Sequence, residues 1–573
     1  MKYLLLIIGS FLFISSSFGQ EDKWTVMVNS IPVKNVKEFK KVTIDNYSKE
    51  LKKTISLVIQ QGYLTANIDS IAKNDSSKTV NIYYHQGEQF SWGTLSVSNK
   101  NKNILSKVGY GERLESNKPF SPKKLAQLVT KTLSYLENNG FPFAQVKLDS
   151  CIIDENSIHA KLNINKGKLI KIDSVFIKSE ERINAKTVYN YIKISPNDFY
   201  NQKRINEIAQ RINEVPYWSE LKPVEYEFVN GACNLYIYIK STKANNFNGV
   251  LGIQPNQQGK ISLTGDVKVK LLNSFYRGEL IDFNWKQTQA LTQSLQIKFD
   301  YPYLFNTKFG TATQLNIYKK DTSYVDRNVK LGIDYFISGL NKIAVFYENK
   351  NSILLSAKKY VTSNVLPNFA DVSKNNYGLK LELENLDYRF NPRKGFSFKI
   401  KGSVGTKKIK KNLVLPEALY DGLNLTTFIY NAETNFRFFI PIIKRSTLLF
   451  QLKGASFFNE NIFANELYRI GGASTIRGFD EESMFVSSYL ISTFEYRFIL
   501  EQNANIYLFY DYAWLEKNER NNYDKDQPYS FGLGISFDTK PGIFSLSYAL
   551  GSQYGAPIYL KTAKVHFGFT SFF

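Results

Sequence analysis

The chain has 573 residues, 73 lysines and arginines against 51 aspartates and glutamates, and a formal net charge of +22. This length exceeds one ordinary hydrophobic core and predicts several domains. The two cysteines, Cys151 and Cys233, are too few for a disulfide-framed scaffold, and their places in different predicted modules favour free, buried thiols over a bond between them.

Residues 1–19 are predicted to be a removable export signal. Lys2 supplies a positive start, residues 3–13 are almost wholly apolar, and small residues precede Gln20. The alternative is a membrane anchor, but the apolar run is too short to cross a bilayer core of about 30 Å comfortably. Export argues against nucleic acid as a partner, and the positive charge suits acidic lipid headgroups or lipopolysaccharide.

The segment that follows contains a repeat of about 80 residues. Two amphipathic helical stripes end at Gly62 and Gly140, which are 78 residues apart. Glycines between two strand-like segments recur at Gly87 and Gly167, which are 80 residues apart. Two independent offsets of similar size indicate duplicated βαβ-type modules.

Each helical stripe is followed by a strand-like segment, at residues 63–68 and at residues 143–146. Ser121 and Pro122 have the residue types of an N-cap and a first helical position. A third, less regular copy has a helical stripe from Ile205 to Ile212 and a closing strand from Leu235 to Ile239. Three α+β modules are therefore predicted, at residues 20–90, 91–170 and 171–243.

Residues 244–573 change to period-two alternation of apolar and polar side chains, as in Leu295 to Tyr301. No stretch of 18 apolar residues follows the signal, so the predicted route into a membrane is a closed antiparallel β-barrel. The aromatic content of the whole chain, 43 phenylalanines and 37 tyrosines, suits the aromatic girdles of such a barrel. A soluble β-sandwich is the alternative, but it would bury its apolar face against a second sheet. At about 20 residues per strand with its connection, the segment gives a transmembrane barrel of about 16 strands.

A charged loop lies between strands of this type. Residues 471–479 read Gly-Gly-Ala-Ser-Thr-Ile-Arg-Gly-Phe, and the alternation of the next two strands places Glu495 and Asp511 on the inner face. The planar guanidinium of Arg477 can satisfy both carboxylates if the loop folds back into the barrel. Gly478 would let the backbone approach the wall, and Phe479 would wedge among lumenal side chains. The alternative is an exposed surface arginine that contributes little.

The chain resembles the outer-membrane assembly and secretion superfamily of BamA/TamA type, the bacterial surface antigen family, in which periplasmic POTRA modules precede a sixteen-stranded barrel. Its loop motif is matched by Ile476-Arg477-Gly478-Phe479, with isoleucine in place of the usual valine. Further matches are Glu495, the Phe509-Tyr510-Asp511 strand, the segment from Asp387 to Gly395, and Gly532, Gly534 and Pro541 to Ala549 near the end. Tyr512 departs from the small residue that the family often has there.

The resemblance implies an outer-membrane protein with POTRA modules in the periplasm, which receives unfolded outer-membrane protein clients at exposed strand edges and inserts them through a lateral seam of the barrel. The implied seam joins a first strand with Asn248, Gly249 and Gly252 to a last strand with Phe569 and Phe573. Accessory periplasmic or lipoprotein subunits are further implied partners. A two-partner secretion transporter that exports a polypeptide through the lumen, and a passive diffusion pore, remain the alternatives.

Catalysis is not predicted. The three histidines, His85, His159 and His566, lie in unrelated segments, so no metal-binding pair is formed, and no nucleophile elbow or phosphate-binding loop occurs. We therefore expect no catalytic residues, no metal site and no cofactor.

Overall fold

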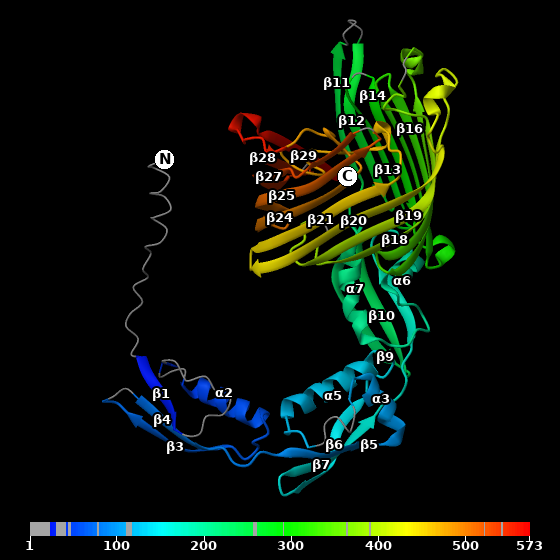
Figure 1. Ribbon diagram of the computed structural model, residues 1–573. Coiled ribbons are helices and arrows are strands. Elements are labelled where there is room, and N and C mark those ends of the chain that lie inside the picture. The colour runs from blue at the N-terminus through cyan, green and yellow to red at the C-terminus, as the bar shows by residue number, and fades with distance from the viewer. Residues whose placement is uncertain are drawn as a thin grey trace. The chain divides into compact units, whose positions relative to one another are not determined.

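The computed structural model describes residues 23–29, 42–43, 47–76, 79–110, 117–255, 261–289, 291–362, 365–388, 391–520, 522–539 and 542–572 (Figure 1). The predicted export signal and Phe573 lie outside these ranges. The chain forms two compact units, one made of residues 1–171 with 199–202 and the other made of the remainder. Within the described ranges, no helix is long and apolar enough to span a bilayer.

The first unit holds two small α/β modules. The first module consists of β1 (Lys23–Asn29), β2 (Val42–Thr43), α2 (Tyr47–Gln60), β3 (Asn67–Asn74) and β4 (Thr79–His85). The second consists of β5 (Ser91–Val97), η1 (Asn99–Asn101), α3 (Lys102–Lys107), α5 (Pro122–Glu137), β6 (Gln145–Asp154) and β7 (Ser157–Asn165). The helices of the second module pack on its sheet through a core that includes Leu105, Leu136 and Leu162.

A third module belongs to the second unit and consists of β8 (Ile172–Lys178), α6 (Ala185–Ile192), α7 (Gln202–Glu214), β9 (Trp218–Val229) and β10 (Ala232–Ser241). All three modules share one topology. The last strand of each lies beside the first in parallel and beside the preceding strand in antiparallel, giving the orders β2-β1-β4-β3, β5-β7-β6 and β8-β10-β9. The repeat in the sequence is thus a repeat of sheet topology.

The boundaries of helices and strands in the modules differ slightly from the predicted ones. The start of α5 is as predicted, because Ser121 caps the helix by accepting a hydrogen bond from the Lys124 N–H and proline follows at the next position. The strand predicted at residues 63–68 begins only at Asn67, because residues 63–66 form a turn in which the Ala66 N–H donates to the Tyr63 carbonyl at 3.3 Å. The strand predicted at 143–146 likewise begins at Gln145.

Both cysteines are free, and one differs from the expectation of burial. Cys233 on β10 is buried, and burial raises the pKa of its thiol to about 11. Cys151 is exposed because it lies on β6, which pairs with only one neighbour and so forms the edge of its sheet.

The remainder of the second unit is a closed antiparallel β-barrel. Its wall consists of β11 (Asn246–Pro255), β12 (Ile261–Leu272), β13 (Leu280–Gln289), β14 (Thr292–Tyr301), β15 (Phe309–Lys320), β16 (Tyr324–Ser338), β17 (Asn341–Leu354), β18 (Val372–Leu386), β19 (Gly395–Ile409), β20 (Thr426–Ile443), β21 (Ser446–Phe458), β24 (Ser488–Glu501), β25 (Ala504–Glu519), β26 (Asn522–Asp526), β27 (Tyr529–Thr539), β28 (Gly542–Ser552) and β29 (Lys564–Phe572). Short β26 and the longer β27 both pair with β25 and occupy one place in the wall, so the barrel has the predicted sixteen strand positions.

Side chains of the wall alternate between a polar interior and an apolar exterior, as the sequence predicts. On β24, Phe494 is 53% exposed and Tyr496 41%, whereas their neighbours Thr493 and Glu495 are buried. The lumen contains several ion pairs between strands, including Lys401 with Glu348 and Lys342 with Asp334. A polar interior of this kind separates the fold from a soluble sandwich.

At the rim opposite the third module, two connections form a structure that we call the cap. It comprises residues 355–362, 365–371 and 410–425 and contains η3 (Ala357–Tyr360) and η4 (Glu417–Tyr420). The cap has its own hydrophobic core, in which Leu366, Leu415 and Tyr420 pack with Phe463 from a later loop. That loop is the part of the barrel that carries the candidate site.

Candidate functional site

The connection between β21 and β24, residues 459–487, returns into the barrel. It contains η5 (Ala464–Glu466) and a hairpin of β22 (Tyr468–Ile470) and β23 (Met484–Val486). The tip of the hairpin is packed against the wall, because Ile476 is fully buried with Ile491 of β24 and Ala513 of β25. We call residues 459–487 the lumenal loop.

Arg477, at the tip of the lumenal loop, lies between the two predicted carboxylates. Its Nε and Nη2 atoms donate to Asp511 Oδ2 and Oδ1 at 2.8 and 2.7 Å, and Nη1 donates to Glu495 Oε2 at 3.0 Å. The guanidinium also stacks over Phe509, with Cζ 3.5 Å from the ring centroid. The side chains of Glu495 and Asp511 are only 6% and 1% exposed, so neither carboxylate relies on bulk water.

Two further side chains complete this polar cluster, and neither was among the predicted site residues. The Thr493 hydroxyl donates to Asp511 Oδ1 at 2.8 Å, and Arg497 Nε donates to Glu495 Oε1 at 2.6 Å. Both residues are two positions from Glu495 on β24, so the period-two alternation that placed Glu495 inside also placed them inside. The alternation along β24 therefore already indicated that Thr493 and Arg497 face the lumen beside Glu495.

Gly478 and Phe479 fit closely against the last strands. Gly478 has a φ of 84°, and a Cβ there would lie 3.1 Å from backbone atoms of Leu550 and Gly551 on β28. Phe479 lies over Gly551, where an added Cβ would come within 2.8 Å of the ring. The Gly478 N–H donates to His566 Nε2 on β29 at 3.1 Å, a contact that no pattern in the sequence predicts.

Gly478→Ala is expected to lower the thermal transition of the folded barrel by several degrees. The methyl group would face backbone atoms that cannot rotate away, and the left-handed backbone adds a strain of roughly 1–2 kcal/mol. Heat-dependent electrophoretic mobility measures the transition. Gly422→Ala is the matched control, because Gly422 has a φ of 77° but nothing within 4 Å of an added Cβ; equal shifts in both variants would mean that the close contact contributes nothing.

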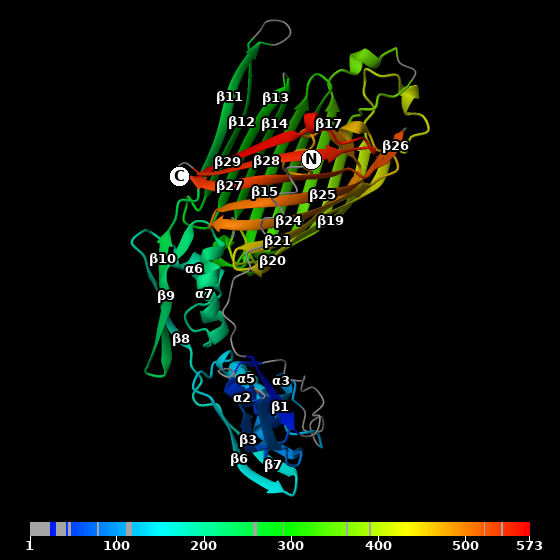
Figure 2. The same cartoon turned by 90° about the vertical axis from the view of Figure 1, so that its left-hand side faces the viewer.

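The junction between the first and last strands of the barrel is short. Among the described residues, β11 pairs with β29 at two positions, Asn246 with Phe572 and Phe247 with Ser571, whereas it pairs with β12 at ten. Figure 2 shows β11 and β12 continuing beyond the point where β29 meets β11. We call this junction the seam.

The described residues that were predicted for the seam lie outside the two paired positions of β11 and β29. Gly249 and Gly252 have register partners on β12 and none on β29, and Asn248 also lies just beyond the two paired positions. Phe569 contacts the neighbouring strand β28 and not β11, with its ring centroid 4.5 Å from that of Phe544. Phe573 lies outside the described residues.

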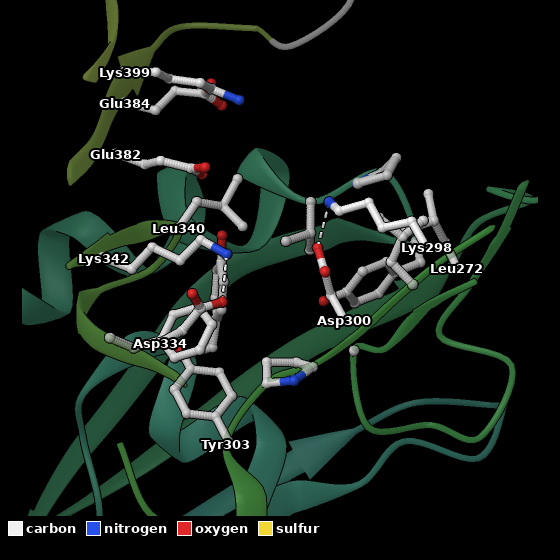
Figure 3. A pocket seen from close by; sticks show the side chains of 18 of the residues that line it. Leu272, Lys298, Asp300, Tyr303, Asp334, Leu340, Lys342, Glu382, Glu384 and Lys399 are labelled. Atoms are coloured by element: carbon white, nitrogen blue, oxygen red, sulfur yellow. Dashed lines mark hydrogen bonds and ion pairs between the residues drawn. The ribbon is translucent and has the colours of Figure 1, made fainter. Parts of the chain in front are cut away.

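The third module contacts the barrel rim around a cavity of about 210 Å³ (Figure 3). Two ion pairs of the barrel line it, Lys298 with Asp300 at 2.5 Å and Lys342 with Asp334 at 2.6 Å, as does Tyr191 of α6. Beside the cavity, the last turn of α7 rests on the turn between β16 and β17. Burial raises the pKa of Glu214 in that turn of α7, although Arg211 opposes the shift.

Within the described residues, no group of three or more histidine, cysteine or acidic side chains could hold a metal ion. Residues 273–573, more than half of the chain, match the family model of the Omp85 superfamily domain. The chain belongs to the Omp85 superfamily. It is an outer-membrane protein whose α/β modules lie in the periplasm.

Three proteins similar to this Omp85 protein have sequence identities between 14% and 29%. A segment of 101 residues is 29% identical to the outer membrane protein assembly factor BamA of Buchnera aphidicola subsp. Acyrthosiphon pisum (strain APS), and the alignment spans 17% of this chain and 16% of that relative. CdiB from Acinetobacter baumannii has a similar structure at 15% identity, with a TM-score of 0.51 over 92% of this chain and 97% of that one. BamA from Haemophilus ducreyi lacking POTRA domains 1–3 gives a TM-score of 0.42 at 14% identity, over 85% of this chain and 100% of that chain. The likeness to CdiB shows the fold alone.

Proposed function

We propose that this Omp85 protein inserts client β-barrel proteins into the outer membrane by opening at the seam. The observation that carries the proposal is the imbalance in strand pairing, two positions between β11 and β29 against ten between β11 and β12. Opening the seam breaks strand pairing at two positions, whereas separating β11 from β12 would break it at ten. The seam is therefore the place where these strands separate at the lowest cost.

An open seam exposes the unpaired N–H and C=O groups of β11 and β29, and such an edge templates another strand. A client strand that pairs with β11 would enter the bilayer sideways, with its backbone groups satisfied throughout. The lumenal loop supports this route over passage through the lumen, because its tip occupies the interior and is bound there by Arg477.

The periplasmic modules are proposed to deliver the clients. The edge strands β6 and β9 offer one free backbone edge each, since each pairs with a single neighbour in its sheet. Exposed apolar side chains accompany these edges, including Ile152 and Ile153 on β6 and Leu221 on β9. An unfolded client can add a strand there by β-augmentation.

The partners follow from this role. Unfolded outer-membrane proteins are the proposed clients, and outer-membrane lipids with lipopolysaccharide are the proposed surroundings of a chain with a net charge of +22. Accessory periplasmic or lipoprotein subunits are proposed to assist, as the BamA resemblance implies. A two-partner secretion transporter is the second candidate, and it differs in sending its polypeptide through the lumen. No enzymatic activity is proposed.

Depletion of the protein, followed by quantification of the outer-membrane proteome, tests the proposal. Loss of many barrel proteins is expected. Loss of one secreted polypeptide with the barrel proteins unchanged would favour two-partner secretion, and altered uptake of small solutes with an unchanged proteome would favour a pore. Either result would overturn the insertion proposal.

Removal of the first two modules, residues 20–171, is expected to leave an inserted barrel that no longer handles clients. The third module is retained because it lies in one compact unit with the barrel. Complementation of the depleted strain measures the activity, and heat-dependent mobility measures folding. Undiminished client insertion by the shortened protein would show that the two modules do not deliver clients.

A further inference from the structure

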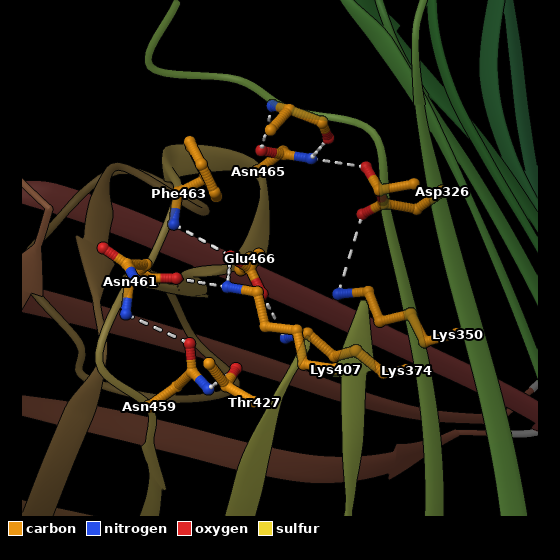
Figure 4. Close-up of polar contacts among 12 residues, drawn as sticks. Asp326, Lys350, Lys374, Lys407, Thr427, Asn459, Asn461, Phe463, Asn465 and Glu466 are labelled. Atoms are coloured by element: carbon orange, nitrogen blue, oxygen red, sulfur yellow. Dashed lines mark hydrogen bonds and ion pairs between the residues drawn. The ribbon is translucent and has the colours of Figure 1, made fainter. Parts of the chain in front are cut away.

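The lumenal loop is bound to the barrel at a second place, far along the wall from Arg477. In its first half, Glu466 accepts ion pairs from Lys374 of β18 at 2.7 Å and from Lys407 of β19 at 2.5 Å (Figure 4). The side chains of Glu466, Lys374 and Lys407 are 1%, 7% and 0% exposed. Because water hardly reaches these three charged groups, each is stabilised by its oppositely charged neighbour and not by solvent.

Additional hydrogen bonds fix Glu466 and its neighbours. The Phe463 N–H donates to Glu466 Oε2 at 2.9 Å, and Lys407 Nζ also donates to the Asn461 carbonyl. Burial alone would raise the pKa of Glu466, but Lys374 and Lys407 outweigh it and hold the pKa at about 2. The carboxylate is thus ionised throughout the physiological pH range.

This arrangement is the reverse in charge of the one at the tip of the loop. At the tip, one loop cation lies between two wall carboxylates, on β24 and β25. At Glu466, one loop carboxylate lies between two wall cations, on β18 and β19. The two wall segments are separated by β20 and β21 in the barrel order, so the loop spans part of the lumen between two ionic attachments.

The loop also joins two regions that share no strand. Next to Glu466, the Asn465 side chain donates to the Ala370 carbonyl in the cap at 2.9 Å, and Phe463 lies in the hydrophobic core of the cap. At the tip, the Gly478 N–H donates to His566, and Asp480 pairs with Lys564 at 2.7 Å, both on the last strand β29. A continuous chain of contacts therefore runs from the extracellular cap to one edge of the seam.

We propose that Glu466 is a positioning residue whose attachment to Lys374 and Lys407 sets the closed state of the seam through the lumenal loop. Release of Glu466 loosens the loop under the cap, and the loosening reaches β29 through the contacts at the tip. This proposal rests on the proposed function only in identifying the seam as the place that opens.

A purely local role for Glu466 makes a different prediction. Distant sites that act independently affect stability and local opening additively and leave each other's surroundings unchanged. A local attachment would therefore alter the first half of the loop and the cap, and would leave β29 as it is. Local opening of a strand is reported by exchange of its backbone amides with deuterium.

The experiment compares amide exchange in the full-length protein in liposomes, without client. In Glu466→Gln, exchange of β29 and of the β11 positions that pair with it is expected to accelerate about tenfold, within the range of known couplings between sites. Exchange of β15, which lies in the wall away from both attachments, is expected to stay unchanged. Faster exchange confined to the loop and the cap would overturn the proposal.

Two further variants separate coupling from general damage. Asp326→Asn is the matched control, since Asp326 pairs with Lys350 at 3.7 Å inside the lumen but both residues belong to the wall; it is expected to leave β29 unchanged. Lys374→Gln combined with Lys407→Gln removes both wall cations and leaves Glu466 without its ion pairs, so it is expected to accelerate exchange at β29 as Glu466→Gln does. Acceleration at β29 in the Asp326→Asn control, or an unchanged β29 in the double variant, would overturn the proposal.

If Glu466→Gln does not reach the heat-resistant folded form, Glu466→Asp gives the same comparison, because it keeps the charge and shortens the reach to the two lysines. Client insertion is measured separately. Coupling of Glu466 to β29 together with a seam that plays no part in client insertion would reject the proposed function and leave this inference standing.

Discussion

Arg477→Ala is expected to produce a barrel that loses its heat-resistant mobility and most of its activity. The substitution leaves Asp511 and Glu495 buried without the cation that lies between them. Removal of one partner from a buried ion pair typically costs about 3–5 kcal/mol, because the remaining charge is uncompensated. Asp511 is affected more than Glu495, which keeps its contact with Arg497.

The measurement is the temperature at which the folded band disappears, together with complementation of the depleted strain. Arg477→Lys keeps the charge but cannot donate in the planar fork that serves both carboxylates, so an intermediate loss is expected. Arg469→Ala is the matched control within the same loop, because the ion-pair partner of Arg469, Glu482, is 47% exposed and 3.7 Å away. Arg477→Ala with unchanged mobility and activity would mean that Arg477 does not hold the lumenal loop to the barrel wall.

A second substitution tests whether the uncompensated charge is the cause. Asp511→Asn in the Arg477→Ala background removes the more buried carboxylate charge and is expected to recover part of the thermal stability. Activity is not expected to return with it, since the loop tip still lacks its attachment. Recovery of both together would mean that the arginine serves only to neutralise the wall.

The barrel was predictable from the sequence because period-two alternation directly encodes which side chains face lipid and which face the lumen. The same alternation placed Glu495 and Asp511 on one face. The pairing of Arg477 with these two carboxylates was also predictable, since two neighbouring carboxylates inside a barrel need a cation and the loop supplies one.

The contacts of Glu466 and His566 were not predictable in the same way. Glu466 lies in a short turn with no periodicity, and its partners Lys374 and Lys407 come from strands more than 50 residues earlier. Nothing in a single sequence relates that turn to those strands, because the relation is created by the fold of the lumenal loop. His566 occupies an ordinary inward position on β29, and only the path of the loop tip gives it a partner.

A disulfide across the seam is expected to block client insertion while leaving the protein folded in the membrane. Phe247→Cys and Ser571→Cys occupy register partners on β11 and β29. Partners in antiparallel strands have Cα atoms about 4.5–5.5 Å apart, within the range that a disulfide spans. The background carries Cys151→Ser, because Cys151 is exposed, whereas the buried Cys233 is retained.

Insertion of a radiolabelled client barrel into liposomes that contain the cross-linked protein measures the effect, and reduction of the disulfide is expected to restore insertion. The matched control joins β11 to β12 through Asn246→Cys and Lys270→Cys, which are also register partners. That bond adds a constraint between strands that already pair over ten positions, so insertion is expected to continue. A client strand can use the edge of β11 only after β29 has left it, and for that reason the two cross-links should differ. Full activity of the β11–β29 cross-linked protein would place the client path in the lumen, past the loop that Arg477 holds there.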